Sequence, residues 1–207
     1  YEQGQDAVAL EELRQSLALR PDLAPAWHLR GLVLMRQGQW DPARESLERS
    51  LALAPQDADL LHNLGWLMCQ QPQPRPDEAE ALFRRALATA VSAKTWTALG
   101  LCQQRAGQAE RAQASLQQAL ALAPDQAQAL WPLAQVLYAQ GQWQQAWDTL
   151  ARLHARHAAS APSLWLAIRA ARKLDNGELA RPAMAQLRQE FGRSPQAQAL
   201  DKGWFDE

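Results

Sequence analysis

Small and apolar residues recur along the chain at spacings that place them on one side of a helix. Between these runs a Gly or a Pro interrupts the pattern, so that a helix–loop–helix outline repeats. Ala, Leu, Gln, Arg and Glu dominate the composition, whereas the β-branched residues, which are weaker helix formers, are scarce. The pattern predicts an all-α protein.

An internal repeat underlies this outline. The blocks 24–57 and 93–126, each 34 residues long, share residues at six spaced positions. The matched pairs are Trp27 and Trp96, Gly31 and Gly100, Gly38 and Gly107, Ala43 and Ala112, Leu47 and Leu116, and Pro55 and Pro124. The blocks resemble the tetratricopeptide repeat, which has an aromatic residue at position 4, small residues at positions 8 and 20, Gly near position 15 and Pro at position 32. The resemblance implies a superhelix of antiparallel helix hairpins, an α-solenoid.

The residue type at each of these repeat positions has a structural explanation. Small residues at positions 8 and 20 let the two helices of a hairpin approach closely, and Gly at position 15 supports the tight turn between them. Pro at position 32 ends the second helix before the next unit. A single hairpin cannot bury its apolar face, so we expect the hairpins to stack.

The register predicts one array over residues 1–207. Its parts are a truncated unit with only the second helix (1–23), full units at 24–57, 58–92, 93–126 and 127–160, a degenerate unit at 161–195, and a C-terminal cap at 196–207. Because the first unit lacks its first helix, we expect the chain to be a piece of a longer protein.

The second unit departs from the pattern. Ala79 and Phe83 lie two residues further from Gly65 than the repeat requires, so the turn of this hairpin carries an insertion. The insertion contains Pro72, Pro74 and Pro76 and cannot be helical throughout, although Pro76 suits the first turn of the next helix. On the residues alone, the simplest interpretation is a stiff loop with no further role.

Two short stretches of sequence resemble one particular family of tetratricopeptide-repeat proteins. Gly-Trp-Leu-Met-Cys at 65–69, before the Pro-containing turn, and Gly-Leu-Cys at 100–102 are similar to the PilF/PilW family of pilotin-like lipoproteins of type IV pilus biogenesis. The similarity extends over roughly residues 50–200. It implies a non-enzymatic scaffold that assists assembly or outer-membrane localisation of the pilus secretin. The alternative is a general tetratricopeptide adaptor, or a periplasmic assembly factor or chaperone cofactor, that binds another protein partner.

The resemblance also implies a location. It places the protein at the periplasmic face of the outer membrane, with a lipid anchor on the full-length protein and no direct membrane contact by this fragment. A cytoplasmic location is the alternative if the resemblance is wrong.

The chain has two cysteines, Cys69 and Cys102, on the first helices of adjacent predicted units. On the residues alone they form either a disulfide, if their Cα atoms lie within about 7 Å, or two buried free thiols. The family resemblance, with its oxidising compartment, implies the disulfide.

In tetratricopeptide arrays the first helix of each hairpin lines a groove that binds a partner. Carried onto this sequence, the groove positions predict an apolar and aromatic surface with a basic C-terminal end, formed by His28, Leu32, Met35, Arg36, His62, Trp66, Trp131, Tyr138, Trp165 and Arg169. Partner binding and simple packing both remain open for Trp66, Trp131 and Trp165.

Several classes of function are not expected. The 21 Lys and Arg residues nearly balance the 22 Asp and Glu residues, and no run of like charge offers a surface for nucleic acid or an anionic membrane. No window approaches 18 uninterrupted apolar residues, so we expect no transmembrane helix. No phosphate-binding, dinucleotide, metalloprotease or serine-hydrolase motif is found, and His154 and His157 lack a third ligand, so we expect no enzyme, cofactor or metal site.

Overall fold

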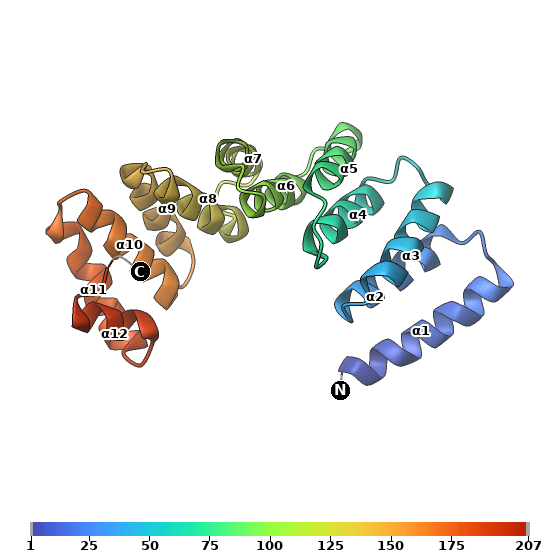
Figure 1. Ribbon diagram of the computed structural model, residues 1–207, viewed down its shortest axis with the longest axis horizontal. Helices are drawn as coiled ribbons and strands as arrows, with labels where there is room; N and C mark the ends of the chain where they lie inside the picture. The colour runs from blue at the N-terminus through green and yellow to red at the C-terminus, as the bar shows by residue number, and fades with distance from the viewer. Residues whose placement is uncertain (1, 206–207) are drawn as a thin grey trace. The chain divides into compact units, whose positions relative to one another are not determined.

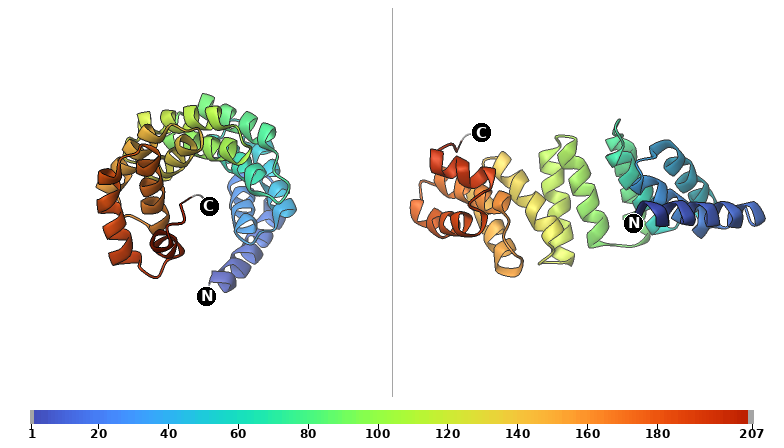
Figure 2. Two further views of the ribbon diagram at one scale, coloured as in Figure 1. Left: turned by 60° about the vertical axis from the view of Figure 1, so that its left-hand side comes forward. Right: turned by 90° about the horizontal axis from the view of Figure 1, so that it is seen from below.

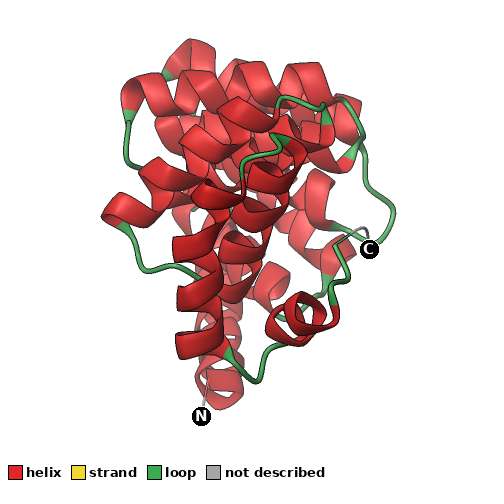
Figure 3. Cartoon of the chain, turned by 90° about the vertical axis from the view of Figure 1, so that its left-hand side faces the viewer, coloured by secondary structure: helices red, strands yellow, loops and turns green. Residues whose placement is uncertain are grey.

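The computed structural model describes residues 2–205, which fold into helices joined by short loops (Figure 1). The described residues contain no strand (Figure 3). The helices are α1 (Glu2–Leu19), α2 (Ala24–Arg36), α3 (Trp40–Leu53), α4 (Ala58–Gln70), α5 (Pro76–Thr89), α6 (Ala93–Arg105), α7 (Ala109–Leu122), α8 (Ala127–Ala139), α9 (Trp143–Arg156), α10 (Ala161–Lys173), α11 (Gly177–Phe191) and α12 (Pro195–Lys202). The all-α prediction is confirmed. None of the described helices has the length and hydrophobicity that crossing a bilayer requires.

The chain divides into two compact units, Tyr1–Cys102 and Gln103–Glu207, with the boundary inside α6. In the first unit, α2 pairs with α3 and α4 with α5 as helix hairpins, and α1 packs on α2 (Figure 2). The main core of this unit includes the fully buried side chains of Leu47, Leu67 and Phe83.

In the second unit, α8 pairs with α9 and α10 with α11, while α7 packs against α8. Leu164, Ile168 and Leu187 are fully buried between α10 and α11. The short helix α12 adds Ala197 and Leu200 to the same core, so it closes the apolar side of the last hairpin.

The small residues at position 8 allow close helix packing, as their spacing predicts. A Cβ atom on Gly31 of α2 would lie 2.6 Å from Leu47 Cγ of α3. A Cβ atom on Gly65 of α4 would lie 3.1 Å from Phe83 Cε1 of α5. Because the facing residues are large and fully buried, these hairpins depend on the missing side chain.

Four of the hairpin turns share one backbone conformation. Gly38, Gly107 and Gly141 have φ values of +71°, +74° and +75°, in the left-handed region that favours Gly. In the last hairpin Asp175 occupies the corresponding position with φ +53°. The turn geometry is therefore retained in the degenerate unit, although its sequence mark is lost.

The lengthened turn of the second full unit occupies residues 71–75. The Arg75 N–H donates to the Met68 carbonyl oxygen at 2.9 Å, and the Gln71 side-chain amide donates to the Gln73 carbonyl oxygen at 2.9 Å. α5 then begins at Pro76, as predicted. The insertion does not disturb the core, since Phe83 is fully buried.

The prolines at position 32 have a second role in the structure. The Arg85 guanidinium of α5 donates to the Pro55 carbonyl oxygen at 3.3 Å, and that of Arg152 in α9 donates to the Pro124 carbonyl oxygen at 2.6 Å. In both places an Arg on the second helix of one repeat donates a hydrogen bond to the end of the preceding repeat. This contact recurs at equivalent positions in the two compact units.

Candidate partner-binding faces

Cys69 of α4 and Cys102 of α6 form a disulfide, with their Cα atoms 5.7 Å apart. Each residue is only 3% exposed. Of the two alternatives that the residues alone left open, the structure contains the bond rather than two free thiols. The disulfide joins the hairpin that has the lengthened turn to α6, the first helix of the next repeat.

The predicted groove residues of the first unit lie on α2 and α4 (Figure 1). His28 is half-buried, and the Asn63 side-chain amide donates to its Nε2 atom at 2.7 Å, which links α2 to α4. Burial lowers the pKa of His28 from its usual value. The imidazole is therefore neutral near pH 7 and acts as an acceptor here.

His62 is buried rather than exposed in a groove. Its side chain is 5% exposed, contacts the edge of the Phe83 ring at a centroid distance of 5.7 Å, and lies with Nδ1 3.0 Å from Thr95 Oγ1. Burial, and then the nearby Lys94, lower the pKa of His62 to about 4, against a smaller opposing effect of Asp59. In this structure His62 packs α4 against its neighbours and presents no free surface to a partner.

The other groove residues of the first unit differ in exposure. Arg36 is exposed and forms an ion pair with Asp6 of α1, with Nε 3.0 Å from Oδ2. Met35 and Trp66 are half-buried against the core of the unit, and Leu32 is half-buried on α2. The first unit thus offers a partly apolar face in which most side chains already have contacts within the chain.

The predicted residues of the second unit lie on α8 and α10, and all are half-buried: Trp131, Tyr138, Trp165 and Arg169. The guanidinium carbon of Arg169 lies 5.1 Å from the centroid of the Tyr138 ring, within cation–π range. The Arg169 Nε atom is buried and has no hydrogen-bond partner among the described residues. This face combines aromatic rings with an incompletely paired positive charge.

The end of the described chain covers part of this face. The Phe205 ring stacks on Trp165, with centroids 5.4 Å apart and planes inclined by 17°. The guanidinium carbon of Arg172 lies 3.7 Å from the centroid of the Phe205 ring. Figure 1 shows the C-terminal end of the described chain beside α10. Sequence reasoning missed this contact because Phe205 lies outside the repeat pattern.

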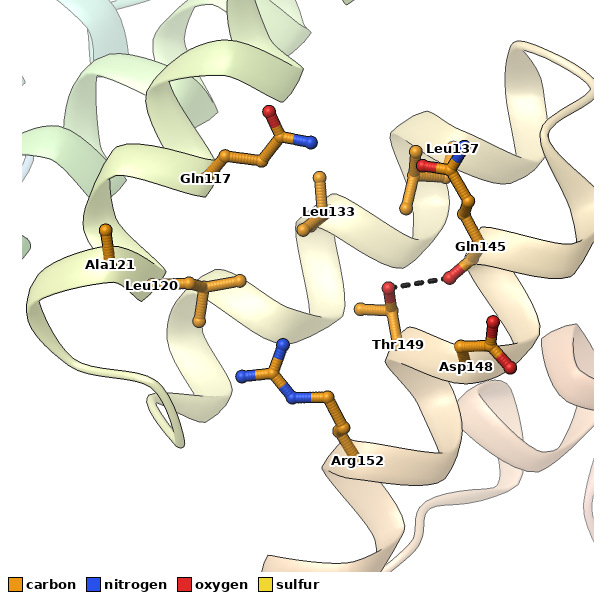
Figure 4. Close-up of a pocket in the computed structure, with 9 residues that line it drawn as sticks. All are labelled: Gln117, Leu120, Ala121, Leu133, Leu137, Gln145, Asp148, Thr149 and Arg152. Carbon is orange, nitrogen blue, oxygen red and sulfur yellow. Dashed lines mark hydrogen bonds between the residues drawn. The ribbon is translucent and has the colours of Figure 1, made fainter.

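A separate hollow of 410 Å³ lies between α7, α8 and α9 (Figure 4). Leu120, Leu133 and Leu137 provide its buried apolar floor. The exposed side chains of Gln117, Asp148 and Arg152 stand at its rim. Neither charge nor spacing in the sequence indicated this hollow, and its rim carries both signs of charge.

The two histidines of α9 and its C-cap have structural partners. His154 Nε2 lies 2.9 Å from Ser163 Oγ, and burial lowers the pKa of His154. His157 Nε2 donates to the Asp125 carbonyl oxygen at 2.6 Å. Within the described residues, no group of three or more His, Cys, Asp or Glu side chains is placed to hold a metal ion.

Comparison with known families agrees with the repeat pattern. A tetratricopeptide-repeat model matches residues 22–90, and a model described as anaphase-promoting complex, cyclosome, subunit 3 matches residues 73–153. No curated protein sequence matches the chain.

Solved structures are similar over nearly the whole chain. PilW, described as a widely conserved type IV pilus biogenesis factor, has 28% identity and a TM-score of 0.83, over 97% of this chain and 93% of PilW. PilF of Pseudomonas aeruginosa has 22% identity and a TM-score of 0.82, over 98% of this chain and 91% of PilF. YrrB, described as a tetratricopeptide protein with an unusual peptide-binding site, has 17% identity and a TM-score of 0.75, over 93% of this chain and 99% of YrrB. At these identities PilF and YrrB show the fold alone. The chain is a tetratricopeptide-repeat protein whose structure resembles the type IV pilus biogenesis factors PilW and PilF.

Proposed function

We propose that the chain is a non-enzymatic scaffold that assists assembly or outer-membrane localisation of the secretin of a type IV pilus. The observation that carries the proposal is the match to PilW, at 28% identity over 97% of this chain and 93% of PilW. Coverage of both chains at this level means that the whole set of hairpins is shared, rather than a few repeats. The short stretches at 65–69 and 100–102 support the same assignment.

The chemistry of the faces fits a protein partner. Trp131, Tyr138 and Trp165 are half-buried aromatic residues on the first helices of their hairpins. Aromatic side chains with part of the ring accessible are common anchors for a bound protein segment, because they bury a large apolar area at little entropic cost. The faces therefore suit a partner segment that contributes aromatic or other apolar side chains.

We further propose a location at the periplasmic face of the outer membrane, and the disulfide supports the oxidising compartment that this location requires. Disulfides persist in oxidising compartments and are rare where thiols are kept reduced. A buried bond between Cys69 and Cys102 is in accord with a protein that works in the periplasm.

Deletion of the gene in its own host tests the proposal. We expect secretin multimers to disappear from the outer-membrane fraction, as followed by immunoblotting of membrane fractions on non-denaturing gels. Expression of the wild-type chain should restore the multimers, and the variant Trp131→Ala should restore them only in part. Arg193→Glu, on an exposed residue that is not one of the predicted groove residues, is the control and should restore them fully. Normal secretin multimers in the deletion strain would contradict the proposal and leave a general adaptor role.

A further inference from the structure

The described chain ends on an aromatic and basic surface of α10. Trp165, Arg169 and Arg172 are spaced four and three residues apart, which places them on one side of the helix. Phe205 rests on Trp165 and under the Arg172 guanidinium, at the centroid distances of 5.4 and 3.7 Å. An aromatic ring thus already occupies the surface between an indole and a guanidinium.

The contact lies beside a hollow, at the edge of the core that α10, α11 and α12 form. Trp165, Lys202 and Trp204 help to line a hollow of 330 Å³ between α10 and α12. Trp204 is 53% exposed, and the Lys202 ammonium lies 4.4 Å from the centroid of its ring. Gly203, with φ +72°, ends α12 and turns the chain toward α10. A segment attached through one such turn, with an exposed Trp, can leave the surface without unfolding the hairpins.

The surface around Trp165 is positively charged, and this charge favours an acidic ligand. α8 contains no charged residue, and α10 contains Arg169, Arg172 and Lys173 but no acidic residue. The one acidic side chain of α12, Asp201, pairs with Arg188 of α11 at 2.9 Å. Arg169 and Arg172 form no ion pair with a described residue, and the buried Nε atom of Arg169 has no hydrogen-bond partner there. Carboxylates of a bound segment would complement these guanidinium groups.

We propose that the surface formed by Trp165, Arg169 and Arg172 binds a partner segment in which an aromatic residue is flanked by acidic residues, and that Phe205 occupies the aromatic position until the partner displaces it. The chain's own sequence has this composition, because Asp206 and Glu207 follow Phe205. The inference rests on the proposed role as a protein-binding scaffold but does not depend on the partner being a secretin. A tethered segment competes at a high effective concentration, so its removal raises the apparent affinity for a free peptide.

A synthetic peptide tests both parts of the proposal. The probe is fluorescein-labelled Ser-Gly-Asp-Glu-Phe-Asp-Glu-Gly-Ser, and its binding is followed by fluorescence anisotropy. We expect Phe205→Ala to bind the probe about tenfold more tightly than the wild type. In the Phe205→Ala background, Arg172→Glu should weaken binding about tenfold or more, whereas Arg193→Glu should leave it unchanged. Probes with Ala in place of Phe, or with Asn and Gln in place of the acidic residues, should bind more weakly.

Each outcome bears on the proposal. The far-UV circular dichroism of Phe205→Ala shows whether the variant is folded. If it is folded and does not bind the probe, the proposed recognition of an aromatic residue flanked by acidic residues is wrong. Equal affinity of the wild type and Phe205→Ala would overturn the role of Phe205 as a competitor. Because the probe is synthetic, these results are independent of the secretin experiment, which can fail while the peptide still binds.

Fluorine NMR on the unmutated sequence provides a second measurement. The chain has three Phe residues, so labelling with 4-fluorophenylalanine gives three resonances, and the Phe205→Ala spectrum assigns one of them. Saturating probe should shift the Phe205 resonance toward that of a solvent-exposed ring and leave the resonance of the fully buried Phe83 in place. A bound probe with an unmoved Phe205 resonance would overturn displacement.

Discussion

At the scale of the residue, four hairpin turns have a backbone conformation in common although their side chains differ. Gly38, Gly107 and Gly141 adopt the left-handed conformation at little steric cost, whereas Asp175 adopts it with a Cβ atom. The Asp175 side chain makes no hydrogen bond with a described residue that would offset this cost. The last hairpin therefore keeps the turn in spite of local strain.

Replacing Asp175 by Gly tests this interpretation. We expect Asp175→Gly to raise the free energy of unfolding by about 0.5 kcal/mol, because the relieved strain exceeds the added entropy of the unfolded chain. Gly38→Ala should lower it by about 1 kcal/mol, because it introduces the same strain. Urea denaturation followed by circular dichroism measures both changes. A loss of stability in Asp175→Gly would show that the Asp side chain stabilises the turn.

The burial of His62 predicts a dependence of stability on pH. Its pKa of about 4 lies below the usual 6.5, so the unfolded chain binds the proton more readily than the folded chain does. The stabilisation from the neutral imidazole is complete above about pH 6.5 and is lost progressively as the pH falls toward 4. Between pH 7 and pH 5 we expect a loss of about 1–2 kcal/mol from this residue. Urea denaturation at each pH measures the loss.

The variant His62→Gln is the matched control. Gln keeps a polar contact available to Thr95 but does not titrate in this range. Its stability should fall less steeply over the same interval, and the remaining slope should come from groups such as His28 and His154, whose pKa values are also lowered by burial. An unchanged slope in His62→Gln would contradict the role assigned to His62.

At the scale of the element, close approach of the two helices is the feature that each hairpin must achieve. The absent side chain at Gly31 leaves the space that Leu47 fills, and the same relation holds between Gly65 and Phe83. Because Leu47 and Phe83 are fully buried, neither can move aside without disturbing the core.

A double-mutant cycle tests the fit between α2 and α3. Gly31→Ala should lower the free energy of unfolding by about 1–3 kcal/mol, because the new methyl group overlaps the Leu47 side chain. The same change should cost less in a Leu47→Ala background, where the cavity accepts the methyl group. Gly177→Ala, which has nothing within 4 Å, is the control and should not destabilise the protein. Equal costs in both backgrounds would argue against a direct clash.

The disulfide should stabilise the hairpin that carries the lengthened turn. It closes a loop with a sequence separation of 33 residues, for which the chain-entropy model predicts about 3–4 kcal/mol. We therefore expect reduction to lower the melting temperature, as measured by differential scanning calorimetry with and without reductant. The double variant Cys69→Ala and Cys102→Ala should melt near the reduced protein and should not respond to reductant. A response in this variant would mean that the reductant acts elsewhere.

At the scale of the whole molecule, most of the structural features that the sequence could predict follow from the repeat spacing of its small and apolar residues. The helices and the close approach of the hairpin helices at Gly31 follow from spacing, because each repeats a local pattern. The start of α5 at Pro76 follows instead from the suitability of Pro for a first helical turn. The contact of Phe205 with Trp165 joins residues that are far apart in the sequence and belong to no repeat. Burial of His62 depends on three-dimensional neighbours such as Phe83 and Thr95, which helix position alone does not specify. Of the candidate site, the sequence therefore identifies the helices that carry it better than the exposure of its residues.

Repeat stacking also predicts how far a local change spreads. In an array of hairpins each unit contacts mainly its neighbours, so the loss of one link should affect the adjacent helices most. We expect reduction of the Cys69–Cys102 bond to increase amide hydrogen exchange in α4, α5 and residues 93–102 of α6, and to leave α10 and α11 nearly unchanged. Exchange measured by mass spectrometry on peptic fragments resolves these segments. Leu187→Ala, in the core between α10 and α11, is the matched control and should produce the opposite pattern. An equal rise in exchange throughout the chain after reduction would show that stability is shared by the whole array rather than held locally.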